Sequence, residues 1–333
     1  MFRKVSFYKL FGLFQVDKGG AYCFVVRPVS IKLGGKMKKT SIKLNKEWLT
    51  GYLMIFPVVA GLLVFYIYPI FKVIIDSFYE VGSFNKRSFV GLDNYLTMFN
   101  DPKMWSSLTN TFSYVIVIVP GTIIISLLLA ALLNTNIKGR GFFRVVYFIP
   151  AITMGAAVAM IWKWMYNSDH GIINAILNVL GFDSVNFLTN PNTALLSICL
   201  VSIWINVGYN MIILLAGIQG ISKTYYEAAA IDGANLVKQF FGITLPLVTP
   251  TLFFVLITNL IGTFQTFDTI YMMIKESGIA MEATQSMVMY FFRNAFSYSK
   301  KGYASALAVF LFLIIMLVTL IQMKLQKKWV NYE

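Results

Sequence analysis

Six long apolar stretches, separated by short polar segments, make up most of the chain from residue 48 onward. Each stretch approaches the roughly 20 apolar residues with which an α-helix crosses a bilayer. Because a helix satisfies its own backbone hydrogen bonds in lipid, the pattern predicts an all-α, polytopic membrane protein. A membrane β-barrel would instead show alternating segments of about ten residues. The six predicted spans are residues 52–75, 111–133, 143–165, 194–217, 251–274 and 303–323.

The composition supports a membrane location, because 58% of the residues are hydrophobic and only 13% are charged, which is not typical of a soluble domain. Four parts of the chain follow from the pattern. We expect a basic and disordered N-terminal arm over residues 1–47, a membrane domain over 48–325 that contains a polar loop at 218–250, and a tail over 326–333. Met37 offers a second start codon, and we hypothesise that residues 1–36 precede the true start of translation.

The distribution of Lys and Arg predicts the orientation of the spans. These residues are concentrated in the N-terminal arm, in the loops after the second and fourth spans, and in the tail. Positively charged loops are retained on the cytoplasmic side of a membrane. We therefore expect both termini and the polar loop at 218–250 to face the cytoplasm. The net charge of +14 is explained by this topology and by attraction to anionic lipids, so it does not indicate nucleic-acid binding.

The sequence lacks the residue patterns of common enzymes. It has one histidine, His170, and contains no H-E-x-x-H motif, no G-x-S-x-G motif and no glycine-rich phosphate loop. Cys23 and Cys199 lie in the arm and in the fourth span, which supports neither a disulfide nor a metal cluster. We predict that this chain has no catalytic residue, no metal site and no bound cofactor.

The polar loop between the fourth and fifth spans carries the strongest local signals. Thr224 and Glu227 have the spacing of a capping box, which predicts a helix that begins at Tyr225. Gly233 should end this helix in a left-handed conformation, and a second short helix should follow at 235–241. The pattern alone fits two interpretations equally well. The loop lies on the lipid headgroups, or it is a coupling element that fits a groove on a partner protein.

A resemblance favours the second interpretation. The run Y-E-A-A-A-I-D-G-A at 226–234, followed by I-T-L-P at 243–246, resembles the EAA signature of bacterial ABC-importer permeases. Further matches at 89–95, 262–268 and 302–308 resemble the carbohydrate-type permeases, which are akin to the maltose and glycerol-3-phosphate systems. The resemblance covers residues 48–325 and implies the type I importer fold in the bacterial inner membrane.

The resemblance also implies a set of partners. In that family a permease pairs with a second, homologous permease, two ATPase subunits bind ATP and Mg on the cytoplasmic face, and an extracytoplasmic binding protein delivers the solute. This chain would then be a transport subunit and not itself an enzyme. The residues that the resemblance assigns to ATPase coupling are Glu227, Ala228, Ala229, Ala230, Asp232, Gly233, Ala234, Leu245 and Pro246.

The solute path is predicted from polar residues inside apolar spans, where contact with lipid would be costly. Amide and carboxylate groups suit sugar hydroxyls, but hydrogen bonding between helices explains such residues as well. On a straight fifth helix, Asp268 would lie near the outer membrane surface. The candidate path residues are Asn206, Gly208, Asn210, Asn259, Gln265 and Asp268.

Two other functions were weighed. An ion-coupled secondary transporter of a small polar solute should contain buried ionisable residues and internal repeats, and neither stands out. An intramembrane enzyme should carry a catalytic group inside a span, and none is evident. The sequence therefore predicts an importer permease for a sugar, an oligosaccharide or a related solute, without identifying which.

Overall fold

A computed structural model describes residues 13–16, 22–25, 46–81, 87–135, 137–274 and 278–331. Contacts between residues divide the chain into two compact units, 1–60 and 61–333. Within the first unit, strands β1 (Leu13–Val16) and β2 (Tyr22–Val25) pair in antiparallel fashion. Apart from these strands and residues 46–47, the arm predicted to be disordered lies outside the described residues.

The first apolar segment is helical throughout but changes its winding. Helix α1 (Lys46–Leu62) continues into a five-residue π turn (Leu63–Ile67) and then into α2 (Tyr68–Asp76). Pro69 lies in the first turn of α2 and has no backbone N–H to donate. A wider turn before a proline accommodates this missing hydrogen bond.

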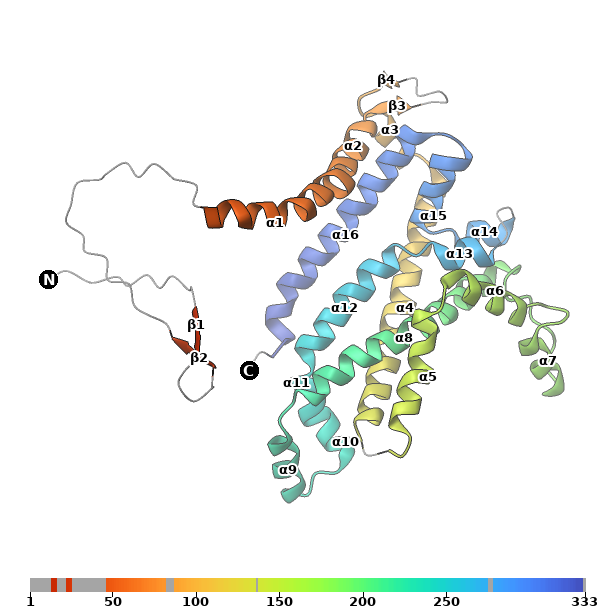
Figure 1. Ribbon diagram of the computed structural model, residues 1–333. Coiled ribbons are helices and arrows are strands. Elements are labelled where there is room, and N and C mark those ends of the chain that lie inside the picture. Colours follow the sequence, from red (N-terminus) through yellow and green to blue (C-terminus); the bar gives the residue numbers. More distant parts are fainter. Residues whose placement is uncertain are drawn as a thin grey trace, which may run out of the picture. The chain divides into compact units, whose positions relative to one another are not determined.

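The second unit is a bundle built around two long, packed helices, α4 (Pro102–Asn134) and α8 (Pro191–Gln219) (Figure 1). At Gly121 of α4, an added Cβ would lie 2.7 Å from Ile203 of α8, so glycine permits the close approach that membrane helices favour. Helix α12 (Thr249–Phe264) and helix α16 (Lys301–Trp329) pack on the same bundle. Helices α9 (Lys223–Ile231) and α10 (Leu236–Gln239) lie at one end, which we refer to as the loop end.

Among the described residues, four helices are long and apolar enough to cross a membrane, and two bent helix pairs raise the number of candidate spans to as many as six. The four are residues 49–76, α4, α8 and α16. The bent pairs are α5 (Arg140–Ile152) with α6 (Gly155–Met165), and 236–247 with α12.

Two predicted spans differ from straight helices. The predicted span 143–165 is divided between α5 and α6, which meet at a bend of 98°. Pro150 lies in the last turn of α5 and supplies no N–H, which favours a break there. The predicted span 251–274 is also wrong at its end, because α12 stops at Phe264 and a separate helix, α13 (Asp268–Met273), follows.

Shorter elements complete the fold. Three of them precede α4: the antiparallel strands β3 (Tyr79–Val81) and β4 (Arg87–Phe89), and helix α3 (Asp93–Phe99). The others are α7 (Ile172–Val179), α11 (Leu245–Leu247), α14 (Ile279–Thr284), α15 (Met287–Phe292) and two further π turns, Phe240–Thr244 and Arg293–Ser297.

Asp101, the N-cap of α4, joins three helices at the end opposite the loop. Its Oδ2 accepts hydrogen bonds from the hydroxyls of Tyr290 on α15 and Tyr303 on α16, and its Oδ1 accepts the N–H of Lys103 at 2.9 Å. Partial burial alone would raise the pKa of Asp101, but the hydroxyl and backbone donors outweigh it and lower the pKa below the ordinary 3.8. The carboxylate is therefore held in its ionised form.

Candidate functional site

The loop at 218–250 begins with a capped helix, although the cap differs from the predicted one. Helix α9 starts at Lys223, and its N-cap is Ser222, whose Oγ accepts the N–H of Thr224. The predicted start at Tyr225 is wrong because this serine occupies the cap position two residues earlier. The Thr224 hydroxyl instead forms a hydrogen bond with the Ser222 hydroxyl at 2.8 Å.

The turn at Gly233 ends α9 as predicted. Gly233 has φ of +75°, and the N–H of Ala234 donates to the carbonyl of Ala229 at 2.9 Å. This hydrogen bond is typical of a helix that stops at a left-handed glycine. Asn235 then caps α10, with its Oδ1 accepting the N–H of Lys238. The predicted second helix is confirmed in position. It continues as a π turn and α11, which ends at Leu247, one residue after Pro246, before a bend of 67° into the next helix.

The loop is tied to itself and to the bundle. The Tyr226 hydroxyl on α9 bonds to the Thr244 hydroxyl at 3.0 Å, and the amide nitrogen of Gln239 donates to the carbonyl of Ala234. Phe240 and Leu245 pack on an apolar cluster formed by the ends of α4, α8 and α12. The loop is therefore packed directly against the ends of these helices.

The surface of the loop combines exposed polar and apolar groups. Glu227, Ala228, Ala230, Asp232 and Gly233 are exposed, whereas Ala229, Ala234, Leu245 and Pro246 are half-buried. Four large apolar side chains are also exposed, by 62% to 88%: Ile231, Leu236, Val237 and Phe241. A cluster of exposed apolar side chains on a polar loop is typical of a protein interaction surface.

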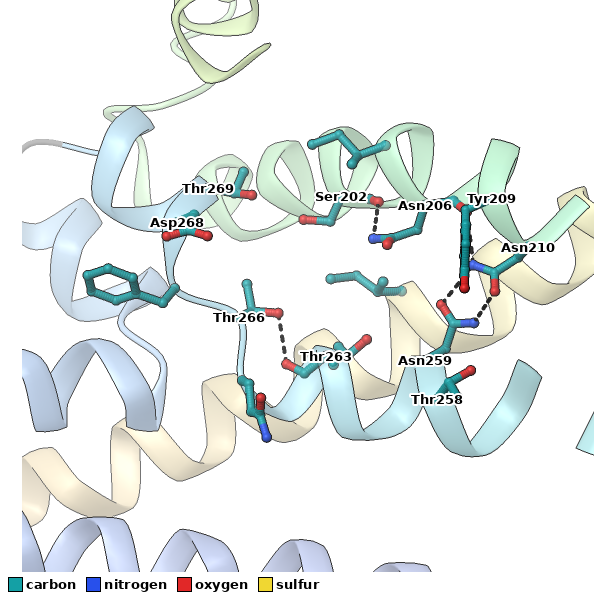
Figure 2. A pocket seen from close by; sticks show the side chains of 15 residues that line it. Ser202, Asn206, Tyr209, Asn210, Thr258, Asn259, Thr263, Thr266, Asp268 and Thr269 are labelled. Carbon is teal, nitrogen blue, oxygen red and sulfur yellow. Dashed lines mark hydrogen bonds between the residues drawn. The ribbon is translucent and has the colours of Figure 1, made fainter. Parts of the chain in front are cut away.

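A polar cavity lies between α8, α12 and the first turn of α13 (Figure 2). Its volume is about 320 Å³, a size that accommodates part of a small solute. The lining carries amides, hydroxyls and one carboxylate, with no cationic side chain. The polar lining residues are Ser202, Asn206, Tyr209, Asn210, Thr258, Asn259, Thr263, Gln265, Thr266, Asp268 and Thr269.

Five of the six candidate path residues line this one cavity: Asn206, Asn210, Asn259, Gln265 and Asp268. Gly208 does not. An added Cβ at Gly208 would lie 1.8 Å from the carbonyl oxygen of Tyr147 on α5. The structure therefore places Gly208 at the close contact between α8 and α5.

Asn210 and Asn259 form a reciprocal pair of hydrogen bonds between α8 and α12. Asn259 Nδ2 donates to Asn210 Oδ1 at 2.8 Å, and Asn210 Nδ2 donates to Asn259 Oδ1 at 3.2 Å. Both side chains are buried. The sequence could not distinguish a solute contact from a bond between helices, and the structure shows the bond between helices for these two residues.

Asp268 was expected near the outer membrane surface on a straight fifth helix, but it begins a separate helix, α13. Because α12 ends at Phe264, the chain turns through Gln265 and Phe267 before α13 begins at Asp268. This turn brings Asp268 and its neighbour Thr269 into the lining of the cavity, which Ser202 of α8 also lines (Figure 2).

The sequence analysis missed the hydroxyl groups of the cavity. Ser202, Asn206 and Tyr209 recur at helical spacing on one face of α8. This spacing was a usable signal for Ser202 and Tyr209. The Oγ of Ser202 is buried and has no hydrogen-bond partner among the described residues.

The described residues thus define a polytopic helical membrane protein that has a polar cavity between two helices and an interaction loop joining the same two helices. The chain belongs to the family of binding-protein-dependent transport system inner membrane components, which it matches over residues 95–331. It is a permease subunit of an ABC importer. Family membership gives no support to the ion-coupled transporter considered from the sequence.

Individual relatives agree with this membership. The chain is 39% identical to the probable ABC transporter permease protein YesP of Bacillus subtilis, over 90% of this chain and 97% of the relative. It is 36% identical to the arabinooligosaccharides transport system permease protein AraP of the same organism, over 82% and 87%. Its fold resembles a chain in the structure of a bacterial alginate ABC transporter in complex with an alginate pentasaccharide-bound periplasmic protein, with a TM-score of 0.79, 21% identity, and coverage of 87% and 98%.

Proposed function

We propose that this chain forms half of the path for a sugar or oligosaccharide and that ATP hydrolysis on partner subunits drives it through the loop at 218–250. One observation carries the proposal: α8 and α12 line the polar cavity and also run directly into the two ends of the loop. A movement at the loop therefore reaches the cavity through helices that are connected to both.

The cavity lining supports a carbohydrate. Sugar hydroxyls both donate and accept hydrogen bonds, and so do amides and hydroxyl side chains. The exposed Tyr209 offers an aromatic ring at the cavity wall. The name of the relative AraP, which refers to arabinooligosaccharides, agrees with this class of solute.

The loop surface supports a cytoplasmic ATPase partner. The exposed apolar side chains of α9 and α10 are typical of a protein interaction surface, and the Lys and Arg distribution predicts that the loop faces the cytoplasm. ATP and Mg would bind to this partner and not to the present chain. A second permease would complete the path, and a solute-binding protein would dock on the opposite face.

The proposal is tested by combining capture with transport. A photoreactive crosslinker attached at Ala229→Cys should capture the ATPase subunit in native vesicles, and uptake of labelled oligosaccharides should require ATP. The same crosslinker at Val179→Cys on α7, which is 87% exposed but far along the chain from the loop, is the matched control. Capture of no ATPase at Ala229, or uptake that persists after ATP depletion, would refute the proposal.

A further inference from the structure

The buried amide pair Asn210–Asn259 occupies a particular place between the loop and the cavity. Gly217 lies near the end of α8, and Asn210 precedes it by seven residues. Thr251 lies near the start of α12, and Asn259 follows it by eight residues. At 1.5 Å per residue, both distances are roughly 10–12 Å along the helix. The two helices therefore run antiparallel and in register from the loop to the amide pair.

A second close contact lies next to the loop. An added Cβ at Gly217 would be 2.8 Å from Cβ of Thr251, so α8 and α12 nearly touch where they leave the loop. The two helices are thus joined at two levels, at Gly217–Thr251 and at Asn210–Asn259. Beyond the amide pair they separate, and the next lining residues, Asn206 and Thr263, face the open cavity (Figure 2).

We propose that the Asn210–Asn259 pair is a positioning device that makes α8 and α12 move as one body, so that a displacement of the loop becomes a displacement of the cavity wall. The inference rests on the proposed function of the loop. It adds that the two helices stay joined throughout the transport cycle. The reciprocal geometry explains why both residues are amides, because each side chain offers a donor and an acceptor to the other.

The chemistry of the pair suits this role. An amide that loses its partner here loses one donated and one accepted hydrogen bond in a largely buried place, which costs free energy unless the groups that line the cavity replace both. Sliding or separation of α8 and α12 would break two hydrogen bonds at once. Asn210 also donates to the carbonyl of Asn206, and Asn259 donates to the carbonyl of Val255, so each amide is held in place by its own helix.

The first experiment joins the two helices covalently outside the cavity. In a chain with Cys23→Ser and Cys199→Ala, the pair Gly217→Cys and Thr251→Cys should form a disulfide on oxidation, because the helices need to separate by only about 1 Å to reach the usual Cβ–Cβ distance. We expect the oxidised complex to retain uptake and the wild-type number of ATP molecules hydrolysed per solute. Loss of uptake on oxidation, restored by reduction, would overturn the inference.

The second experiment removes the pair. Asn210→Leu or Asn259→Leu should leave ATP hydrolysis in place and raise the number of ATP molecules used per solute, because α8 and α12 would then move separately. Adding the Gly217–Thr251 disulfide should lower this ratio again. Ser126→Ala, which removes a buried hydrogen bond from α4 to the carbonyl of Val207, is the matched control and should leave the ratio unchanged.

The outcomes separate the inference from the proposed function. If the wild-type complex shows no ATP-driven uptake, the proposed function fails. If the wild-type complex is active but hydrolysis and uptake fall in parallel in Asn210→Leu and Asn259→Leu, at an unchanged ratio, the pair is merely structural and the inference fails alone.

Discussion

At Gly233 the backbone conformation, and not the surrounding space, limits substitution. Its φ is +75°, and no heavy atom lies within 4 Å of an added Cβ. The left-handed backbone conformation costs most L-residues roughly 1–2 kcal/mol, and it costs Asn and Asp less. Gly233→Asp therefore keeps the turn but places a new negative charge on the proposed docking surface.

We expect Gly233→Asp to insert normally into the membrane and to abolish uptake, because the charge would be buried against the ATPase. Gly233→Asn has the same shape without the charge and should retain most of the uptake. The measurement is transport of labelled solute, normalised to the amount of permease in the membrane. Normal uptake by Gly233→Asp would show that this turn does not dock.

Single residues differ in how well the sequence reveals them. Asn206, Asn210 and Asn259 stand out because an amide is costly in an apolar span. Thr263 does not stand out, because small hydroxyl residues commonly bond to their own helix backbone, and Ser202 is revealed only by its helical spacing from Asn206 and Tyr209. The distinction between a solute contact and a bond between helices, as at Asn210, needs the partner side chain and could not be predicted.

At the scale of helices, Gly208 marks a close contact between α8 and α5. A Cβ there would lie 1.8 Å from a backbone oxygen, which cannot move without the whole helix. We expect Gly208→Ala to lower the free energy of unfolding by about 1–3 kcal/mol, as overpacking does, and to lower the melting temperature of the purified protein.

Gly141→Ala on α5, the helix that Gly208 of α8 contacts, is the control for this prediction. No heavy atom lies within 4 Å of its added Cβ, and alanine favours the helix over glycine. Its melting temperature should be unchanged or slightly higher. Equal melting temperatures for the two variants would show that α5 and α8 do not approach closely at Gly208.

The contact at Asp101 gives a prediction on pH. The pKa of Asp101 is lowered below 3.8, so its stabilising effect is present above this value and is lost as the pH falls through the lower folded pKa. Burial, together with the hydrogen bond to Asp101, raises the pKa of Tyr290 from 10.0 to about 12, so that tyrosine stabilises the fold fully below pH 10 and loses its effect as the pH rises toward 12. Between about pH 4 and pH 10 the contact should be intact.

Comparison with Asp101→Asn checks this window. The variant should melt at a lower temperature, by an amount equivalent to about 1 kcal/mol for a partly exposed charged hydrogen bond. The difference from wild type should be constant from pH 5 to pH 9, within the window derived from the two pKa shifts, and should shrink in stronger acid. A difference that already disappears at pH 6 would contradict a lowered pKa.

The breaks in the helices were beyond the sequence analysis. The polar residues at the breaks, Thr153 and Gln265–Thr266, are few, and hydropathy averaged over a window of about 19 residues reads each region as one span. The bends are set by Pro150 and by the packing of α6 and α13 on the rest of the bundle. The long helices α4, α8 and α16 were predicted correctly, because their apolar runs coincide with single helices.

At the scale of the whole molecule, the orientation in the membrane decides whether the loop can meet an ATPase. Helix α7 precedes α8 and the loop follows it, and α8 has 29 residues, or about 43 Å at 1.5 Å per residue. A helix of this length that crosses the bilayer places α7 and α9 on opposite sides. The Lys and Arg distribution predicts that the loop faces the cytoplasm.

Labelling of single cysteines tests this orientation in a chain with Cys23→Ser and Cys199→Ala. Val179→Cys on α7 should react with a membrane-impermeant maleimide in intact spheroplasts, and Lys223→Cys at the start of α9 should react only after the membrane is opened. Both positions are exposed, so burial cannot explain a difference between them. The reverse pattern would place the loop on the side that holds no ATP, and the coupling role of α9 and α10 could then not stand, whatever their sequence resembles.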